Sequence, residues 1–295
     1  MKPKLIVVLG PTASGKSALA VAIAKKWDGE IISADSRQVY KRMDVGTGKV
    51  TAREMGGVPH HLLSFVSPTR IFTVAQYQKK VRDVIKKILR EKKVPILCGG
   101  TGLYIQSVVD GLVIPEVPPN PALRKKLEGR SAVALYKTLC SLDPIRSKNI
   151  DRKNSRRLIR AIEVAKALGA VPPLRFNPFD GVVLFIGMKK TRQELKYLIR
   201  ARLLKRFKLG IIAEVRNLHV SGISWKRLED FGLEYRDIAH YLRGGITKRE
   251  LVAKLEYHIN QYAKRQMTWF KRDGRIHWVK NKSEAMRLIS TFLNT

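Results

Sequence analysis

Short apolar runs alternate with stretches of helical periodicity in the first part of this 295-residue chain. Runs at residues 5–9, 30–35 and 94–98 have the length and composition of strands that are buried on both faces. Between them, residues 18–27 and 72–93 carry apolar side chains at helical spacing. Because strand, loop and helix repeat in this order, the pattern predicts an α/β fold, a parallel sheet with helices on both faces.

The pattern changes near residue 115. A proline-rich stretch at 115–121 marks a boundary, and helical periodicity continues from there to Pro172-Pro173. A buried strand pattern returns at residues 181–187, and helical segments follow it. We therefore predict that the chain has three parts. Residues 1–114 form the first part of the core, residues 115–180 form a basic helical insertion, and residues 181–295 return to the core and end in basic helices.

The clearest chemical signal lies between the first strand and the first helix. Its residues are Gly10, Pro11, Thr12, Ala13, Ser14, Gly15, Lys16 and Ser17, the pattern of a phosphate-binding loop. Gly10 and Gly15 let the backbone approach phosphate oxygens, and the first N–H groups of the helix converge on an anion. Lys16 adds a positive charge, and the Ser17 hydroxyl can hold Mg²⁺. We expect a phosphate or diphosphate site with Mg²⁺ as cofactor.

Two polar side chains follow neighbouring strands of the predicted sheet. Asp35 ends the second strand, and Thr101 lies in the glycine-rich turn after residues 94–98. Ligands of open α/β sheets bind outside the carboxyl ends of the strands, so both side chains are expected beside the phosphate loop. Asp35 can act as a general base or help to order Mg²⁺. The Thr101 hydroxyl can hydrogen-bond a substrate or cap the helix that follows.

Charge is the strongest feature of the composition. With 58 Lys and Arg against 24 Asp and Glu, the formal net charge is +34. A polyanionic partner is one explanation, and a uniformly lysine-rich surface is the other. In the predicted insertion, helical spacing places Arg156 and Arg160 opposite the apolar Leu158 and Ile162. This arrangement predicts a face that contacts a polyanion, with an ordinary solvated face as the alternative.

Several classes of protein can be excluded. No apolar run approaches the roughly 20 residues of a membrane helix, and the basic N-terminal stretch is too short for a secretory signal. The two cysteines lack the spacing of a zinc site. His60 and His61 are adjacent, and because adjacent side chains diverge on a strand, they do not form a metal pair. We expect a cytoplasmic protein without a membrane partner.

Seven blocks of sequence occur here in the order in which they occur in bacterial tRNA dimethylallyltransferases. The chain resembles this family over nearly its whole length, and departs from its pattern at Ser64, at residues 151–154 and at Ile259-Asn260. The blocks are Gly-Pro-Thr-Ala-Ser-Gly-Lys-Ser at 10–17, Ile-Ser-Ala-Asp-Ser-Arg-Gln-Val-Tyr at 32–40, Met-Asp-Val-Gly-Thr-Gly-Lys at 43–49, Pro-His-His-Leu at 59–62, Gly-Gly-Thr-Gly-Leu-Tyr at 99–104, Arg-Leu-Ile-Arg-Ala-Ile-Glu-Val at 157–164 and Tyr-Ala-Lys-Arg-Gln-Met-Thr-Trp-Phe at 262–270.

The resemblance implies a P-loop fold that transfers a dimethylallyl group from dimethylallyl diphosphate to the exocyclic N6 of the adenosine beside the anticodon. The phosphate loop would hold the donor diphosphate without nucleotide hydrolysis, and the insertion would clasp the anticodon stem-loop of tRNA. Asp35 and Thr101 would be the catalytic residues. Arg202 and Arg206, one helical turn apart, could stabilise the departing diphosphate or form surface ion pairs. The residues expected to contact tRNA are Asp35, Ser36, Arg37, Gln38, Thr101, Arg156, Arg157, Arg160, Lys264 and Arg265.

Three other functions remain as alternatives at this point. A P-loop kinase for a small metabolite shares the first strand and loop, but the chain lacks a carboxylate after residues 94–98 where a second magnesium ligand would be expected. An adenylate isopentenyltransferase would act on free nucleotide and would not need a basic insertion. A nucleotide-switched RNA-binding protein would leave Asp35 and Thr101 without a role. We expect the chain to act as a monomer.

Overall fold

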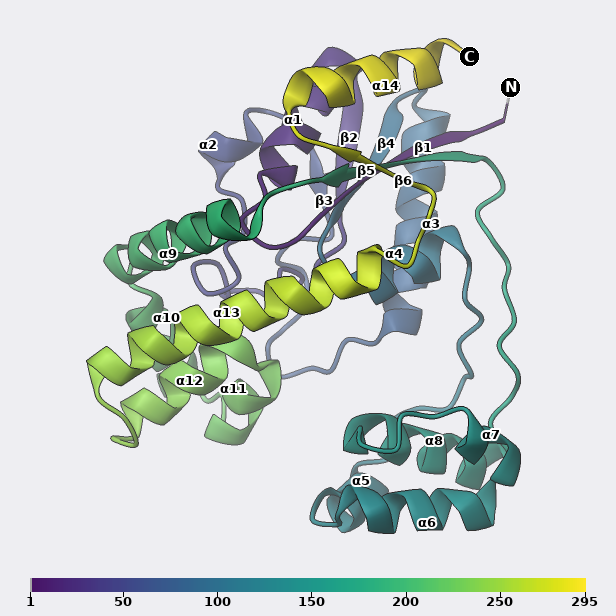
Figure 1. Cartoon of the computed structure of the whole chain (residues 1–295), viewed down its shortest axis with the longest axis vertical. Helices are drawn as coiled ribbons and strands as arrows, with labels where there is room; N and C mark the ends of the chain where they lie inside the picture. Colours follow the sequence, from purple (N-terminus) through teal and green to yellow (C-terminus); the bar gives the residue numbers. More distant parts are fainter. Residues whose placement is uncertain (1) are drawn as a thin grey trace. The chain divides into compact units, whose positions relative to one another are not determined.

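The computed structural model describes residues 2–295, and its centre is a six-stranded sheet (Figure 1). The strands are β1 (Lys4–Leu9), β2 (Gly29–Ser33), β3 (His60–His61), β4 (Val94–Gly99), β5 (Val182–Met188) and β6 (Ile276–Val279). They are all parallel and lie in the order β3-β2-β4-β1-β5-β6. In the centre of the sheet, Ile6 of β1 lies opposite Ile96 of β4 and Leu184 of β5. The predicted α/β fold with a parallel sheet is confirmed.

Helices cover both faces of the sheet. They are α1 (Lys16–Lys26) and α14 (Lys282–Asn294) on one face, and α3 (Val74–Arg90) and α4 (Gly102–Val109) on the other. Odd-numbered residues of β1 such as Leu5 and Val7 pack with α3 and α4, whereas Ile6 and Val8 pack with α1 and α14. This alternation is the two-residue period of a strand buried on both faces. It explains why β1 is a continuous apolar run in the sequence.

A second group of helices has an apolar core of its own. These helices are α9 (Arg192–Lys208), α10 (Ile211–Val220), α11 (Trp225–Phe231), α12 (Leu233–Leu242) and α13 (Lys248–Phe270). Val39, Tyr40 and Met43, which follow β2, are buried in this core. The chain after β2 is therefore held by the helical group. Within residues 2–295 we find no helix with the length and apolar character needed to cross a bilayer.

The buried face of α13 differs from the one that periodicity indicates. The apolar side chains suggest a stripe that includes Tyr262 and Trp269, but both are only half-buried and lie on its flank. The buried side chains follow a spacing of three or four residues and are Leu251, Leu255, Ile259, Ala263, Gln266 and Phe270. A glutamine thus occupies a core position, because its polar atoms have partners in two loops described below.

Residues 112–177 form a compact unit separate from the rest of the chain. Its helices are α5 (Pro121–Glu128), α6 (Ala132–Leu142), α7 (Pro144–Lys148) and α8 (Ser155–Leu168). Leu135 and Leu139 of α6 pack against Leu158 and Ile162 of α8. The unit is thus a small helical bundle with its own core.

A buried carboxylate organises this unit. Glu163 accepts hydrogen bonds from Asn120 N at 2.6 Å, Arg124 Nε at 3.0 Å and Arg160 Nη1 at 2.6 Å. Helical spacing suggested that Arg160 shares a solvated face with Arg156. The guanidinium group of Arg160 instead pairs with Glu163. Arg156 itself is exposed. The spacing identified the face of the helix correctly but not the acidic partner three residues further along.

We expect Glu163→Gln to destabilise the helical unit at neutral pH. Burial acts to raise the pKa of Glu163, but hydrogen bonds from Arg124, the Asn120 amide and Arg160 outweigh it and lower the pKa to about 2. Because a free glutamate has a pKa of 4.5, the carboxylate stabilises the fold above that pH, and this contribution of about 3 kcal/mol is lost as pH falls towards 2. Urea unfolding of both proteins should show that difference at pH 7 and a smaller one at pH 2.5. Equal stability at pH 7 would contradict the assignment.

Candidate active site

The loop between β1 and α1 needs glycine at two positions. Gly10 has φ of +149°, and a Cβ there would lie 2.9 Å from Ser14 Oγ and 3.3 Å from the carbonyl oxygen of Met188. Gly15 has φ of +88° and is the N-cap of α1. Both values favour glycine over any other residue. The loop therefore turns tightly from the central strand into α1, whose N-terminal N–H groups form a site for an anion.

Two arginines of α9 reach this loop. Arg202 Nη1 donates to Thr12 Oγ1 at 3.2 Å, and Arg202 Nη2 donates to the carbonyl oxygen of Gly48 at 2.9 Å. Arg206 Nη1 pairs with Glu234 at 2.7 Å. A Cβ on Gly48 would overlap both guanidinium groups, which places them beside each other. Arg202 therefore hydrogen-bonds to the phosphate loop, whereas Arg206 forms the ion pair of the alternative with Glu234, largely buried instead of at the surface.

The electrostatics of the site favour an anion. Burial lowers the pKa of Lys16, with Cys98 opposing this effect and Arg202 adding to it. Burial, followed by the neighbouring charge of Arg206, lowers the pKa of Arg202 to about 10. Arg206 Nε and Ser14 Oγ are buried and have no hydrogen-bond partner among the described residues. Cations that are desolvated and incompletely paired are stabilised by a bound anion, and a phosphate group fits this set.

Asp35 and Thr101 lie together at the carboxyl ends of β2 and β4. Asp35 Oδ1 accepts a hydrogen bond from Arg37 N at 2.8 Å. Thr101 N donates to the carbonyl oxygen of Ala34 at 3.1 Å, and Thr101 Oγ1 accepts from Ser36 N at 3.1 Å. The side chain of Thr101 makes no capping hydrogen bond to α4. The capping alternative is therefore wrong, and the hydroxyl instead faces the segment that carries Asp35.

Gln266 of α13 connects the two glycine-rich loops. Its Oε1 accepts from Thr12 N at 2.9 Å, and its Nε2 donates to the carbonyl oxygen of Gly100 at 2.9 Å. One turn earlier, burial raises the pKa of Tyr262, while a hydrogen bond with Thr101 acts in the opposite direction. α13 thus sets the distance between the phosphate loop and Thr101. The sequence analysis missed Gln266, and its only signal was its place in the 262–270 block.

Comparison with known proteins agrees with this geometry. The family model for IPP transferase matches residues 38–273. The chain belongs to the IPP transferase family. A tRNA dimethylallyltransferase of Geotalea daltonii is 41% identical over 286 residues, which cover 96% of this chain and 92% of the relative. One from Treponema pallidum is 45% identical over 287 residues, which cover 93% and 90%.

A solved structure of the family extends the comparison to the whole chain. The tRNA isopentenylpyrophosphate transferase of Bacillus halodurans aligns with a TM-score of 0.75 at 33% identity, over 99% of this chain and 96% of that protein. The solved structure therefore agrees with the family model, and the resemblance that the seven sequence blocks indicated is confirmed.

The remaining predicted residues of this IPP transferase family member lie in four settings. Arg37 lies over the ring of Phe231, with 5.8 Å between the guanidinium carbon and the ring centroid. Gln38 Nε2 donates to the carbonyl oxygen of Gly48 at 3.4 Å. Lys264 and Arg265 are exposed on α13. A further pair, Arg156 and Arg157, is exposed on α8 of the separate helical unit.

The residues that the structure describes do not form a complete metal site. Among residues 2–295 no group of three or more His, Cys, Asp or Glu side chains is placed to hold a metal ion. His60 Nδ1 contacts the carbonyl oxygen of Val58 at 2.8 Å, while His61 Nε2 contacts Glu30 at 2.6 Å. The two histidines thus have separate partners. A magnesium ion at Ser17 would need oxygen ligands from the substrate.

Proposed function

We propose that this chain transfers a dimethylallyl group from dimethylallyl diphosphate to the exocyclic N6 of the adenosine adjacent to the anticodon of tRNA, and releases diphosphate. The observation that carries the proposal is the meeting of Lys16 and Arg202 at the phosphate loop with Asp35 and Thr101 at the same edge of the sheet. Membership of the IPP transferase family supports it. We also propose that the chain acts as a monomer in the cytoplasm.

The phosphate loop and its cations would bind the donor. Lys16 and Arg202 would face the diphosphate and stabilise the negative charge that develops as the bond between C1 and oxygen breaks. Ser17, together with diphosphate oxygens, would hold Mg²⁺, which supplies further neutralisation of this charge. Pyrophosphate is the leaving group, so ATP is not consumed.

Asp35 and Thr101 would act on the acceptor. The lone pair of an adenine N6 is delocalised into the ring, so N6 is a weak nucleophile until a base removes its proton. In the proposed step N6 bonds to C1 of the donor while the C1 to oxygen bond breaks, and Asp35 takes the N6 proton. Asp35 Oδ1 is occupied by backbone amides, whereas Oδ2 accepts no hydrogen bond from residues 2–295. Thr101 Oγ1 accepts from Ser36 N, and its hydroxyl, which also contacts Tyr262, would hydrogen-bond the base or the leaving oxygen of the donor.

Mass analysis of nucleosides tests this function. Purified protein, unmodified tRNA, dimethylallyl diphosphate and Mg²⁺ should yield one prenylated adenosine, located beside the anticodon, and one pyrophosphate per product. A parallel reaction with AMP in place of tRNA should yield no prenylated nucleotide, and added ATP should remain intact. Prenylated AMP with unmodified tRNA would support the adenylate isopentenyltransferase instead, and hydrolysed ATP with a phosphorylated metabolite would support the kinase.

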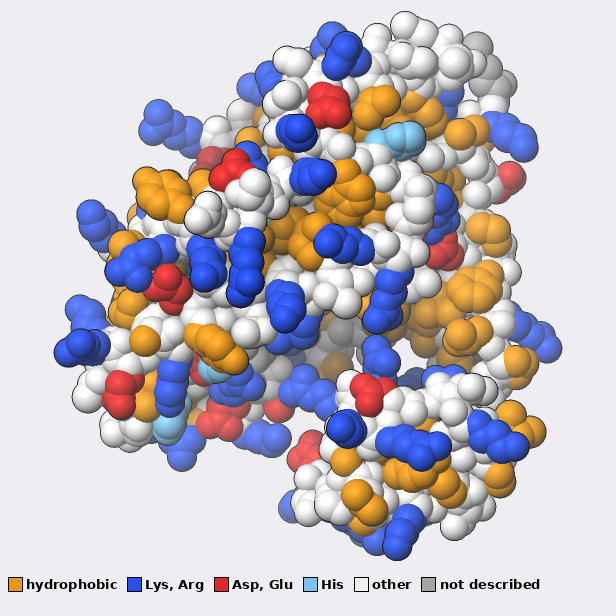
Figure 2. Space-filling model, in the orientation of Figure 1, with side chains coloured by type: hydrophobic (Ala, Val, Ile, Leu, Met, Phe, Trp, Pro, Cys, Tyr) orange, Lys and Arg blue, Asp and Glu red, His pale blue; other side chains and the backbone are white. Residues whose placement is uncertain are grey.

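We expect tRNA binding to weaken steeply with salt. Figure 2 shows Lys and Arg side chains over both the helical group and the separate helical unit, with fewer Asp and Glu side chains. Each phosphate contact contributes about 0.7 to 0.9 to the slope of log affinity against log salt, because a counterion is released. Ala at both Arg156 and Arg157 should therefore flatten the slope by up to roughly 1.4 to 1.8 and leave donor binding intact.

The matched control keeps both charges by placing Lys at Arg156 and Arg157, and it should retain most of the slope. Arg160 is left unchanged in both variants, because its loss would also unbalance the buried Glu163. Filter binding at several salt concentrations gives the slopes. An alanine variant with the slope of the original protein would assign both arginines to an ordinary solvated face.

A further inference from the structure

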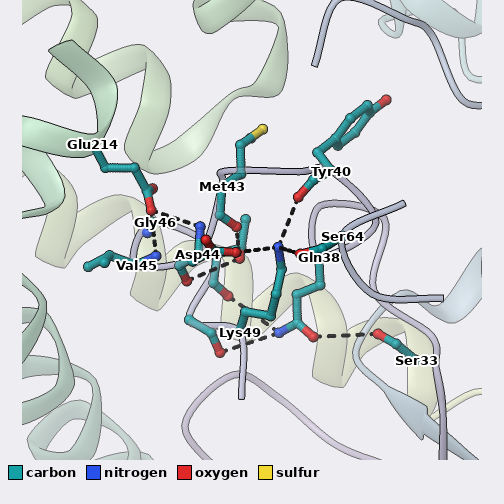
Figure 3. A network of polar contacts seen from close by, with 12 residues as sticks. Ser33, Gln38, Tyr40, Met43, Asp44, Val45, Gly46, Lys49, Ser64 and Glu214 are labelled. Carbon is teal, nitrogen blue, oxygen red and sulfur yellow. Dashed lines mark hydrogen bonds and ion pairs between the residues drawn. The ribbon is translucent and has the colours of Figure 1, made fainter. Parts of the chain in front are cut away.

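The loop at residues 43–49 is built around a carboxylate from a distant helix (Figure 3). Glu214 of α10 accepts hydrogen bonds from three successive backbone N–H groups, those of Asp44 at 2.7 Å, Val45 at 2.6 Å and Gly46 at 2.9 Å. The Tyr235 hydroxyl donates to the same carboxylate at 2.8 Å. Successive N–H groups that converge in this way form a binding site for an anion. Here the anion is a side chain of the protein itself.

A buried lysine fixes the other end of the same loop. The side chain of Lys49 is 6% exposed, and its Nζ donates to Asp44 Oδ1 at 2.6 Å, to the carbonyl oxygen of Tyr40 at 2.8 Å and to Ser64 Oγ at 2.5 Å. Thr47 Oγ1 donates across the loop to the carbonyl oxygen of Met43 at 2.6 Å. The loop is therefore held by side chains at both ends, and the peptide groups between the two anchors have little freedom to move.

Between these two anchors lies the carbonyl group of Gly48, which is a hydrogen-bond acceptor for Arg202. Gly48 O accepts from Arg202 Nη2 at 2.9 Å, and Arg202 Nη1 continues to Thr12 Oγ1 of the phosphate loop at 3.2 Å. Arg206 lies beside Arg202, and its positive charge is one of the causes that lower the pKa of Arg202. The two like charges repel, so Arg202 needs a fixed acceptor to keep its guanidinium group aimed at the phosphate loop.

We propose that Glu214 is a positioning residue for the donor diphosphate. It fixes the loop at residues 43–49, the loop presents the Gly48 carbonyl, and this carbonyl orients Arg202 toward the phosphate loop. The hydrogen bonds of Glu214 go to the loop and to Tyr235, so it acts through Arg202 and not on the substrate. This inference rests on the proposed function, because it takes the donor diphosphate as the ligand of Arg202.

Binding of inorganic pyrophosphate tests the role of Glu214 separately from catalysis. Glu214→Gln keeps the volume and one acceptor oxygen but removes the charge, and titration calorimetry should show a dissociation constant raised by roughly tenfold. Glu214→Ala should raise it by up to roughly 100-fold. In steady-state kinetics the KM for dimethylallyl diphosphate should rise in parallel, while the KM for tRNA stays within about twofold.

Two further variants separate positioning from loss of stability. Tyr235→Phe removes one donor to Glu214 and should weaken pyrophosphate binding in the same direction by a smaller factor, with the fold intact. Glu250→Gln is the matched control, because Glu250 also accepts a backbone hydrogen bond, from Thr247 N at 2.7 Å, but at the start of α13. This control should lower the melting temperature and leave pyrophosphate binding unchanged.

The coupling to Arg202 can be measured directly. In a protein that carries Arg202→Met, the added change Glu214→Gln should have little further effect on pyrophosphate binding, because the two residues act in one chain of contacts. Additive effects of the two changes would overturn the inference, as would normal pyrophosphate binding by Glu214→Gln or an equal loss in Glu250→Gln. If the unaltered protein fails to bind pyrophosphate, the proposed donor site fails first and the role of Glu214 with it.

Discussion

Asp35→Asn should slow the transfer of the dimethylallyl group from bound donor to bound tRNA by roughly 10² to 10⁴-fold, or about 3 to 5 kcal/mol of barrier. The amide keeps the shape of the side chain, and its oxygen can still accept from Arg37 N and Gln38 N, as Asp35 Oδ1 does. What it loses is the capacity to take the N6 proton. The position of the segment should therefore be preserved while the chemical step fails.

Single-turnover kinetics with saturating donor and excess enzyme measure this step alone. A defect in binding is overcome by excess enzyme, whereas a defect in chemistry is not. The tRNA dissociation constant of the variant should change far less than the rate, because Arg156 and Arg157, the proposed contacts to tRNA phosphates, are untouched. A near-normal single-turnover rate would remove Asp35 from the role of base and transfer that role to the bound pyrophosphate.

Lys16→Met should reduce kcat/KM for the donor by roughly 10² to 10³-fold, since it removes a preorganised positive charge at the leaving group. The same variant should be no less stable than the original protein without ligand. Burial lowers the pKa of Lys16, so the charged amine is less favourable in the folded state than in the unfolded chain. This cost is present at neutral pH and disappears only as pH rises towards the ordinary pKa of 10.5.

Lys25→Met is the matched control for Lys16, because Lys25 lies on the same helix α1 and is exposed. It should leave both the donor kinetics and the melting temperature nearly unchanged. Thermal melts with and without pyrophosphate complete the comparison. The original protein should gain stability from the ligand and Lys16→Met should gain much less. A Lys16→Met protein with normal donor kinetics would contradict the proposed site.

The sequence allowed the prediction of those parts of the site whose residues are close along the chain. Residues 10–17 form their loop without help from distant segments, because the glycines and the start of α1 lie within one motif. Asp35 and Thr101 could be placed together because parallel strands end at one edge of a sheet. Periodicity sufficed for β1 and α3, whose apolar residues are strongly patterned, but it indicated the wrong buried face for the second half of α13.

The supporting residues could not be predicted, because their partners lie far away in the sequence. Glu214 is 170 residues from Asp44, and Gln266 is 254 residues from Thr12. Glu214 does not interrupt the pattern of its helix, and although Gln266 is a polar residue within the buried stripe of α13, nothing local identifies its partners. For Arg160, helical spacing indicated the direction of the side chain but not the ion pair with Glu163. Hydrogen bonds between elements depend on tertiary packing, which periodicity does not encode.

The two ends of the helical unit at residues 112–177 meet each other. Leu112 pairs with Phe176 in an isolated bridge, and just outside the unit Phe179 N donates to the carbonyl oxygen of Val109 at 2.9 Å. A segment whose ends are adjacent can be inserted into a protein through one interruption of the chain. The unit is therefore an insertion between α4 and β5 whose surface can change in sequence while the register of the sheet, and the site at its edge, stay fixed.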